Sequence, residues 1–182
     1  MSRFLRSSND FFQKNHIGYL EIPYFSRRIK LNRMKDFTIQ PLKGYGEIPF
    51  GMTLDETVKL LNMPDFYEEL SDMEETGNRS IYYEYDELQT NIYFEGITKS
   101  VIACFETENE EATMYGQKVF DLKKDDVVKL MQEHGFKELD EGEEDGELRV
   151  SFEDALTDFF FEGDKMTAVS WGVLVDDQGD II

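Results

Sequence analysis

The sequence has a single cysteine, two histidines and half as many cations as acids. Cys104 has no second cysteine with which to form an internal disulfide, so we expect a reducing, cytoplasmic environment. No apolar run approaches the roughly 20 residues that span a bilayer. The N-terminus is basic but lacks the apolar stretch of a secretory signal. We therefore expect neither membrane insertion nor secretion.

Scarcity of positive charge dominates the composition. The chain has 19 Lys and Arg against 39 Asp and Glu, a formal net charge of −20. Residues 1–35 carry eight basic and two acidic residues, a net +6, so the remainder carries 11 basic and 37 acidic residues, a net −26. A body this negative repels nucleic acid and anionic lipid and attracts cations. We therefore predict a basic protein as the partner, with no binding of nucleic acid or membrane.

Residues 1–35 differ from the rest of the chain. They are basic, aromatic and weakly periodic, and a second methionine, Met34, lies near their end. One interpretation is a peripheral or poorly ordered arm folded over the acidic body. The other is translated leader sequence, with the natural start at Met34.

Residues with catalytic or metal-binding chemistry are too few and too dispersed to form a recognisable site. His16 and His134 each lack another Cys or His at metal-ligand spacing, and Cys104 has no adjacent histidine. The acidic stretches 140–147 and 176–180 do not match the calcium-binding EF-hand pattern. We therefore predict no catalytic residue, metal or cofactor. We expect Cys104 to be a buried small hydrophobe and His134 to lie at a helix end.

Segments of the body resemble one another in the same order. The helical stretches are offset by 70 residues and the strand stretches by 67. The corresponding segments are 55–62 with 125–132, 81–85 with 148–152, 90–96 with 157–163, and 99–105 with 166–172. This pattern indicates internal duplication. We predict an α+β fold built from two helix-plus-antiparallel-sheet units, 36–113 and 114–182, after a basic N-terminal segment, 1–35.

Each predicted unit begins with a helix. Thr53 and Glu56 form a capping-box pattern, and Pro64 is expected to end that helix. A second helix is possible over 65–75, and 140–147 is expected to be an acidic loop. In the second unit Asp121 is a plausible N-cap and Gly135 a plausible C-cap. Gly96 and Gly163 stand where hairpins require a positive φ.

Aromatic residues lie on both faces of the predicted strands. Either helices and the partner unit cover both faces, or some rings are exposed and form a protein-binding surface, for which Tyr and Trp are well suited. For the second alternative the candidate contact residues are Tyr83, Tyr85, Tyr93, Glu95, Phe160, Glu162 and Trp171. Glu95 and Glu162 are included because each precedes a hairpin glycine.

The stretch 50–64 resembles the opening of the superfamily of the β-lactamase-inhibitory protein and the small outer-membrane assembly lipoproteins. In that group a Gly-Met-Thr turn, here Gly51, Met52 and Thr53, leads into a helix and then a curved antiparallel sheet. Asn62 stands where the family usually has glycine, and the second unit lacks the Gly-Met-Thr opening. The resemblance implies a tandem helix-plus-sheet fold that binds proteins on its sheet faces. The lipoprotein role is not implied, because no lipidated cysteine is present.

These patterns together favour a non-enzymatic, acidic protein-binding module. The most concrete form of the hypothesis is a bacterial immunity or inhibitor protein that neutralises a basic toxin or enzyme. A carboxylate-based hydrolase with its site between the two units is one alternative. A structural or regulatory homodimer is another, so the chain is expected to be a monomer or a homodimer.

Overall fold

A computed structural model describes residues 34–72, 78–144 and 146–182. The chain divides into two units, 1–30 and 31–182, and all described residues belong to the second. The elements before residue 113 are β1 (Thr38–Gln40), β2 (Gly44–Tyr45), β3 (Ile48–Pro49), α1 (Leu54–Leu61), β4 (Phe66–Asp72), β5 (Asn78–Tyr85), η1 (Asp86–Leu88), β6 (Thr90–Glu95) and β7 (Val101–Thr107). The later elements are β8 (Thr113–Met114), β9 (Gln117–Lys118), η2 (Val119–Asp121), α2 (Lys124–Glu133), β10 (Leu139–Glu144), β11 (Glu147–Phe152), η3 (Glu153–Ala155), β12 (Thr157–Glu162) and β13 (Lys165–Gly172).

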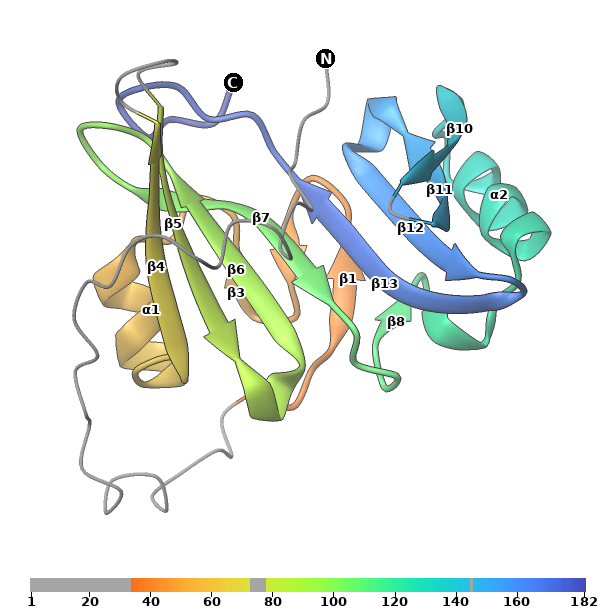
Figure 1. The fold of residues 1–182 in the computed structure, drawn as a ribbon, viewed down its shortest axis with the longest axis horizontal. Helices are drawn as coiled ribbons and strands as arrows, with labels where there is room; N and C mark the ends of the chain where they lie inside the picture. Colours follow the sequence, from red (N-terminus) through yellow and green to blue (C-terminus); the bar gives the residue numbers. More distant parts are fainter. Residues whose placement is uncertain (1–33, 73–77, 145) are drawn as a thin grey trace. The chain divides into compact units, whose positions relative to one another are not determined.

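These strands form two sheets (Figure 1). The smaller has five short strands in the order β3-β2-β1-β8-β9, and the larger has eight strands in the order β10-β11-β12-β13-β7-β6-β5-β4. Within the larger sheet all neighbours are antiparallel, and β13 pairs with β7 to join its two halves. Strands from both sides of residue 113 therefore share one continuous sheet.

The core lies between the larger sheet and the layer formed by the helices and the smaller sheet. At its centre the rings of Phe105 and Trp171 stack with centroids 5.4 Å apart, and Tyr45 of the smaller sheet meets Trp171 edge-on at 5.1 Å. The indole Nε1 of Trp171 donates a hydrogen bond to the carbonyl of Gly44, 3.0 Å away. All three rings are buried. This contact fixes the two sheets against each other.

The predicted α+β fold of duplicated helix-plus-sheet units is wrong. The described chain is dominated by strands, which form sheets of five and eight strands, while α1 has 8 residues and α2 has 10. Both predicted helices exist, but they are short, and the strands of the two predicted units pair with one another in one sheet, which periodicity along the chain does not show. The fold is therefore a β-rich one in which two short helices cover part of one sheet face.

Two segments account for much of the difference. Residues 65–75 were a possible helix, but β4 pairs with β5 from Phe66 opposite Glu84 to Asp72 opposite Asn78; residues 73–75 lie outside the described chain. Residues 140–147 were expected to be a loop, but β10 occupies most of them and pairs with β11. Both are edge strands of the sheet. Acidic side chains do not prevent an edge strand from pairing with its neighbour inside the sheet. On the free edge of the same strand they discourage pairing with a further strand.

Local signals at the helix ends were more informative. In α1 the Thr53 hydroxyl accepts a hydrogen bond from the Glu56 amide, and the Glu56 carboxylate accepts from the Thr53 amide at 2.9 Å, which confirms the capping box. The helix ends at Leu61, before Pro64. The prediction of Asp121 as N-cap of α2 is wrong, because Asp121 lies in η2 and the N-cap is Lys123.

The glycines expected at turns have the conformations that turns require. Gly96 and Gly163 follow β6 and β12 with positive φ values of 107° and 60°. The C-cap of α2 is His134 and not the predicted Gly135, which follows it with a positive φ of 101°. No helix among the described residues is long and apolar enough to cross a membrane.

Two parts of the larger sheet share their local geometry. The turns η1 and η3 each end in a left-handed residue, Gln89 and Leu156. The following threonines donate to backbone carbonyls two residues earlier, each at 2.9 Å. Register shifts follow in β6 between Tyr93 and Phe94 and in β12 between Phe160 and Phe161. The likeness belongs to strands and turns, so it explains the strand similarity in the sequence without requiring repeated helix-plus-sheet units.

Replacing Trp171 with phenylalanine tests the contact between the sheets. The change leaves the Gly44 carbonyl without its indole donor and removes part of a fully buried ring, so we expect the free energy of unfolding to fall by about 2–4 kcal/mol. Tyr67→Phe, at a half-exposed ring, should cost less than about 0.5 kcal/mol. Urea unfolding of both variants measures the difference. Equal effects would show that the Trp171 contact does not hold the sheets together.

Gly44→Ala tests how closely the strands of the smaller sheet approach. A Cβ at this position would lie 2.1 Å from the Ile48 carbonyl oxygen, and the backbone φ of +149° is itself unfavourable for a side chain. We expect a loss of more than about 3 kcal/mol in the free energy of unfolding. Gly142→Ala is the control, because a Cβ there meets nothing within 4 Å. Thermal or urea unfolding compares them, and similar midpoints would contradict the prediction.

Candidate functional site

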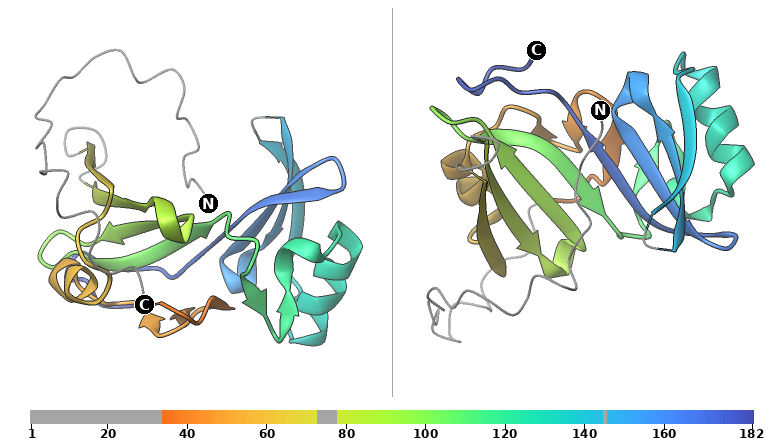
Figure 2. Two further views of the ribbon diagram at one scale, coloured as in Figure 1. Left: turned by 90° about the horizontal axis from the view of Figure 1, so that it is seen from below. Right: turned by 45° about the horizontal axis from the view of Figure 1, so that its top comes forward.

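The larger sheet has a face that points away from the core, which we call the outer face. The helices and the smaller sheet lie against the opposite face, as the left view of Figure 2 shows. Side chains alternate between the two faces of a strand. Thus Tyr83, Tyr85, Ile92 and Phe105 face the core, while their neighbours in sequence face outward. Among the described residues, no α-helix or strand covers the outer face.

A single row of mostly polar side chains crosses the outer face from edge to edge. Directly paired residues of neighbouring strands lie on the same face, so the strand registers define the row without ambiguity. In order from β4 to β10 the row consists of Phe66, Glu84, Asn91, Glu106, Ser170, Asp158, Ser151 and Asp140. We call it the acidic row. It contains four carboxylates and no cation.

Aromatic rings lie beside the acidic row at its β4–β6 end. Tyr82 lies directly opposite Tyr93, with ring centroids 5.2 Å apart, and the Phe66 ring lies 6.1 Å from that of Tyr82. The Tyr82 hydroxyl is within hydrogen-bonding distance of Glu84 Oε2 (3.2 Å) and Asn91 Oδ1 (3.1 Å). Asn91 Nδ2 in turn donates to Glu106 Oε1 at 3.3 Å. The polar network therefore orients two carboxylates of the row next to a pair of packed rings.

The electrostatic environment of this end is negative. Partial burial raises the pKa of Glu84 above its usual value, and the nearby carboxylates of Asp86 and Asp65 raise it further, although the hydrogen bond from Tyr82 opposes the shift. Burial also raises the pKa of the Tyr82 phenol, with Glu84, Glu106 and Asp86 adding to the shift. Both shifts have the sign expected where negative charges outnumber nearby cations.

The centre of the outer face is more deeply buried and has the same sign. Cys104 is buried as predicted, with its Sγ 3.4 Å from the Ser170 hydroxyl. Burial raises the pKa of its thiol above the usual range, and Glu106, Glu95 and Asp158 all raise it further. Burial likewise raises the pKa of Asp158, against the hydrogen bond from Ser151 and the charge of Arg149. A buried thiol with a raised pKa is a poor nucleophile, because the thiolate is the reactive form.

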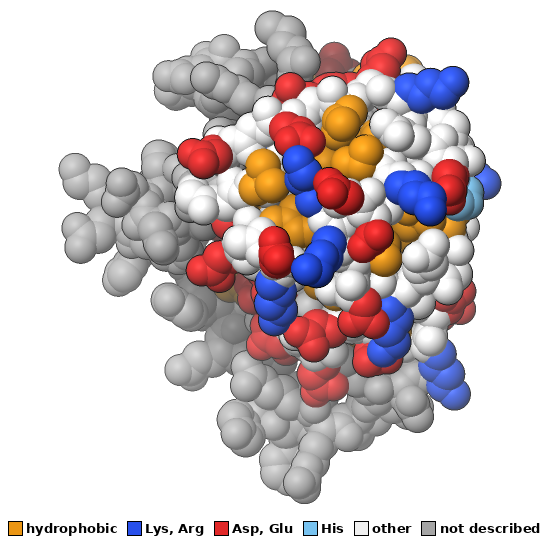
Figure 3. Space-filling view, turned by 90° about the vertical axis from the view of Figure 1, so that its right-hand side faces the viewer, with side chains coloured by type: hydrophobic (Ala, Val, Ile, Leu, Met, Phe, Trp, Pro, Cys, Tyr) orange, Lys and Arg blue, Asp and Glu red, His pale blue; other side chains and the backbone are white. Residues whose placement is uncertain are grey.

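Charges are balanced at the β10 edge and on the neighbouring side of the molecule. Arg149 donates to Asp140 Oδ2 at 3.1 Å, which neutralises the last carboxylate of the acidic row. On the side that includes α2, acidic and basic side chains intermingle around a few apolar ones (Figure 3), and Lys124 pairs there with Glu141 at 3.0 Å. The acidic row is therefore distinct from a surface of ordinary mixed charge.

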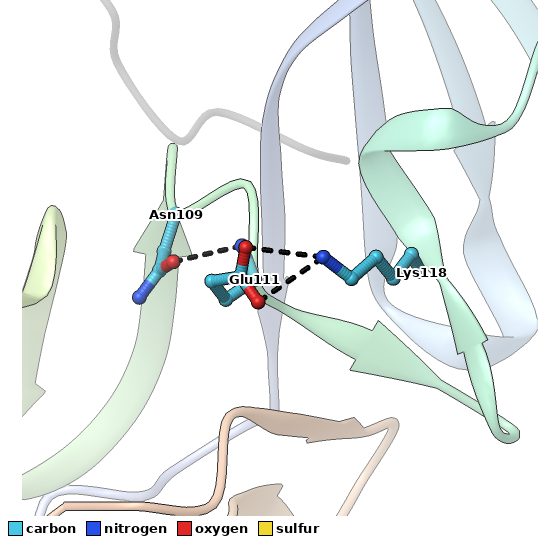
Figure 4. Close-up of polar contacts among 3 residues, drawn as sticks. All are labelled: Asn109, Glu111 and Lys118. Atoms are coloured by element: carbon cyan, nitrogen blue, oxygen red, sulfur yellow. Dashed lines mark hydrogen bonds and ion pairs between the residues drawn. The ribbon is translucent and has the colours of Figure 1, made fainter.

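A typical balanced contact occurs where β7 leads into the β8–β9 hairpin. Both carboxylate oxygens of Glu111 accept hydrogen bonds from Lys118 Nζ, at 3.0 and 3.1 Å (Figure 4). Asn109 accepts a hydrogen bond from the Glu111 amide at 2.9 Å and donates to the Leu88 carbonyl at 3.2 Å. Exposed ion pairs contribute little to stability. Here the pair of Lys118 and Glu111 balances charge locally.

The predicted contact residues divide between the two faces. Trp171, Tyr85 and the half-buried Tyr83 point into the core and therefore do not belong to the outer face. Tyr93 is half-buried on the outer face, and Phe160 lies on that face but is buried. Glu95 is partly buried, which raises its pKa, and Glu162 is exposed at the β12–β13 hairpin. Only some of the predicted set therefore lies together.

Several residues of the site were missing from the sequence-based set, namely Tyr82, Glu84, Asn91, Glu106 and Asp158. The alternation of residues along β5 alone places Tyr82 and Glu84 on one face of the strand and Ile81, Tyr83 and Tyr85 on the other. What it could not provide was the pairing between β7 and β13, which brings Glu106 and Ser170 side by side. The row is a product of register between distant strands.

The other predicted positions have local roles. His134 is the C-cap of α2, with its Nδ1 2.8 Å from the Leu130 carbonyl and its ring stacked on Tyr115 at 3.6 Å. His16 lies outside the described residues. Within the described ranges, no group of three or more Asp, Glu, His or Cys is placed to hold a metal ion.

Comparison with known proteins adds little to this description. No protein-family profile matches the chain, and no curated protein matches it. One similar solved structure is an extracellular protein containing an SCP domain from Bacillus anthracis str. Ames, with 12% sequence identity and a TM-score of 0.42. The match covers 84% of this chain and 50% of that one, so this chain spans about half the length of the matched protein. A likeness this weak carries no argument about function, and the resemblance to the β-lactamase-inhibitory protein superfamily stays a prediction.

The pH dependence of stability tests the environment of Asp158. Its pKa is raised in the folded protein above the ordinary 3.8, so the folded state binds a proton more readily than the unfolded state. Stability therefore falls as pH rises from about 4 through the folded pKa, by about 1.4 kcal/mol for each tenfold difference in proton affinity between the two states. We expect Asp158→Asn to be more stable than wild type at neutral pH and equal to it near pH 4.

Urea unfolding at several pH values measures the effect. Glu47→Gln, at an exposed acid in the turn between β2 and β3, is the control, because it removes one charge without changing the surroundings of Asp158. A variant Asp158→Asn that is less stable than wild type at neutral pH would mean that the charge of Arg149 outweighs burial.

Proposed function

We propose that this protein is a non-enzymatic, acidic protein-binding module that binds a basic protein through the outer face of its larger sheet. In its most concrete form the proposal is a cytoplasmic immunity or inhibitor protein of a bacterium, which neutralises a basic toxin or enzyme. The observation that carries it is the acidic row with the rings of Tyr82 and Tyr93 beside it. Tyrosines next to carboxylates provide anchoring area and charge for a cationic surface.

The mechanism has an electrostatic and a contact stage. The formal charge of −26 on residues 36–182 raises the frequency of productive encounters with a cationic partner. After encounter, the ring pair packs against the partner, and cationic side chains meet Glu84 and Glu106. Screening lengths of about 10 Å at 0.1 M salt and about 3 Å at 1 M mean that the first stage is salt-sensitive and the second much less so.

The alternatives have less support. A hydrolase needs two carboxylates on either side of a bound substrate, with their pKa values moved apart. The pKa values of Glu84, Glu95 and Asp158 are all raised, in the same direction. A homodimer formed through the outer face would place two acidic rows against each other, which like charges oppose.

The test begins with affinity capture from lysate of the source cell, with the full chain as bait. The captured protein is then purified and its association and dissociation rates are measured at low and high salt. We expect a basic partner whose association rate falls at least about tenfold with salt. Tyr93→Ala and Glu106→Gln should weaken binding, mainly through faster dissociation for the first and slower association for the second.

Glu47→Gln is the matched control for charge. Glu47 is exposed in the turn between β2 and β3 of the smaller sheet, so its change alters net charge equally but leaves the outer face intact. Binding that is unaffected by salt, or weakened equally by Glu47→Gln and Glu106→Gln, would contradict the proposal.

A further inference from the structure

Residues 174–182 form a small hairpin, which we call the strap. It lies beside the turn that joins β6 to β7 (Figure 1). A bridge between Val175 and Ile181 holds its two arms together. At its tip the Asp176 carboxylate accepts hydrogen bonds from two later backbone amides of the strap, at 2.9 and 3.0 Å. None of these contacts involves a residue outside the strap, so the strap keeps its shape by itself.

Among the described residues, the backbone hydrogen bonds that join the strap to the rest of the chain all end on one oxygen atom. The Asp177 carbonyl accepts from the amides of Ile97 and Thr98, at 3.0 and 2.9 Å. Of the strap's side chains, Val175 packs against the margin of the core, while Ile181 is 50% exposed. If the strap moved away as a unit, only these two backbone amides would lose their partner, and both would meet water. Segments attached by so few bonds open more readily than the core.

A close approach of two glycines positions the strap on the turn. A Cβ added at Gly96 of the turn or at Gly179 of the strap would lie 2.3 Å from the Lys99 carbonyl oxygen. A Cβ at Gly96 would also lie 3.2 Å from the Cα of Gly179. Gly163, at the corresponding hairpin between β12 and β13, has nothing within 4 Å of such a Cβ. Lack of space therefore requires glycine at the β6–β7 turn, in addition to the positive φ.

We propose that the strap opens and closes as a unit while the two sheets stay folded, and that the contact between Gly96 and Gly179 holds it closed. Val173 stays anchored during this movement, because its amide donates to a carbonyl of β7 at 2.8 Å. The open form exposes the amides of Ile97 and Thr98, and the closed form covers them. A ligand that contacts the strap or the turn shifts this equilibrium by the difference between its affinities for the two forms. The inference does not depend on the proposed function.

Hydrogen exchange of single amides in the full chain, followed by NMR, tests the inference. Ile97 and Thr98 should exchange through opening of the strap, so their protection factors should agree within about threefold. The amide of Ile102 donates to the Met52 carbonyl at 2.9 Å, beside β7, and should be protected at least about tenfold more strongly. Low concentrations of urea should accelerate exchange at Ile102 but not at Ile97 or Thr98, because strap opening exposes little surface.

Gly179→Ala is the variant that opens the strap. The new Cβ would collide with the Lys99 carbonyl oxygen, which belongs to backbone and cannot turn aside as a side chain could. We expect exchange at Ile97 and Thr98 to accelerate at least about tenfold, and exchange at Ile102 to change by less than about twofold.

Gly116→Ala is the matched control. Gly116 has a φ of +80°, close to the +84° of Gly179, but a Cβ there meets nothing within 4 Å. It therefore introduces the same backbone strain without the collision, and exchange at the β6–β7 turn should stay as in the wild type. Ile181→Ala is a milder second variant, since it shortens the side chain that lies against Gly51. It should accelerate exchange at the same two amides by about threefold.

Urea-independent exchange at Ile97 and Thr98 that is accelerated by Gly179→Ala and not by Gly116→Ala supports the inference. Exchange at these amides with the urea dependence of Ile102 would show that the strap opens only when the protein unfolds, which overturns it. Equal effects of the two glycine variants overturn it as well. If Gly179→Ala does not fold, Ile181→Ala decides, and no acceleration by that variant counts against the strap.

Discussion

The pairing of β7 with β13, supported by Trp171, is the interaction on which the rest of this structure depends. These strands come from distant parts of the chain and join two four-stranded meanders into one sheet. Directly beneath the junction, Phe105 and Trp171 stack, and the Trp171 indole reaches the Gly44 carbonyl of the other sheet. One cluster thus fixes the register between the halves and the distance between the sheets. A residue as large as tryptophan, fully buried and hydrogen-bonded, is well suited to such a role.

The same pairing determines the surface. A one-residue slip between β7 and β13 would turn every side chain of one half to the opposite face. The acidic row would then break at Glu106 and Ser170, and apolar residues of the core would be exposed. Burial of Trp171 and alignment of the carboxylates are therefore two consequences of one register. Selection that maintains the core also maintains the spacing of charges on the outer face.

Local features of the structure were predictable from the sequence, and non-local ones were not. The capping box of Thr53 and Glu56 and the positive φ of Gly96 and Gly163 depend on a few neighbouring residues. By contrast, β4 and β10 are strands because adjacent strands supply their backbone partners, and their side chains alone do not specify this. For the same reason alternation correctly separated the faces of β5, yet the sequence could not identify which of its faces was covered. Tyr85 and Trp171 were proposed as contacts on chemical type, and burial places them in the core.

The raised pKa values on the outer face connect stability with the proposed binding. Burial of Glu84, Glu95 and Asp158 disfavours their charged forms, so at neutral pH these carboxylates make the isolated protein less stable than it would be without their charges. A bound cation lowers each of these pKa values and removes part of that cost. Any ligand that binds the folded state and not the unfolded state adds its binding free energy to stability. A cationic partner should therefore stabilise this protein most at neutral pH, where the carboxylates are charged, and its affinity should decrease as they become protonated.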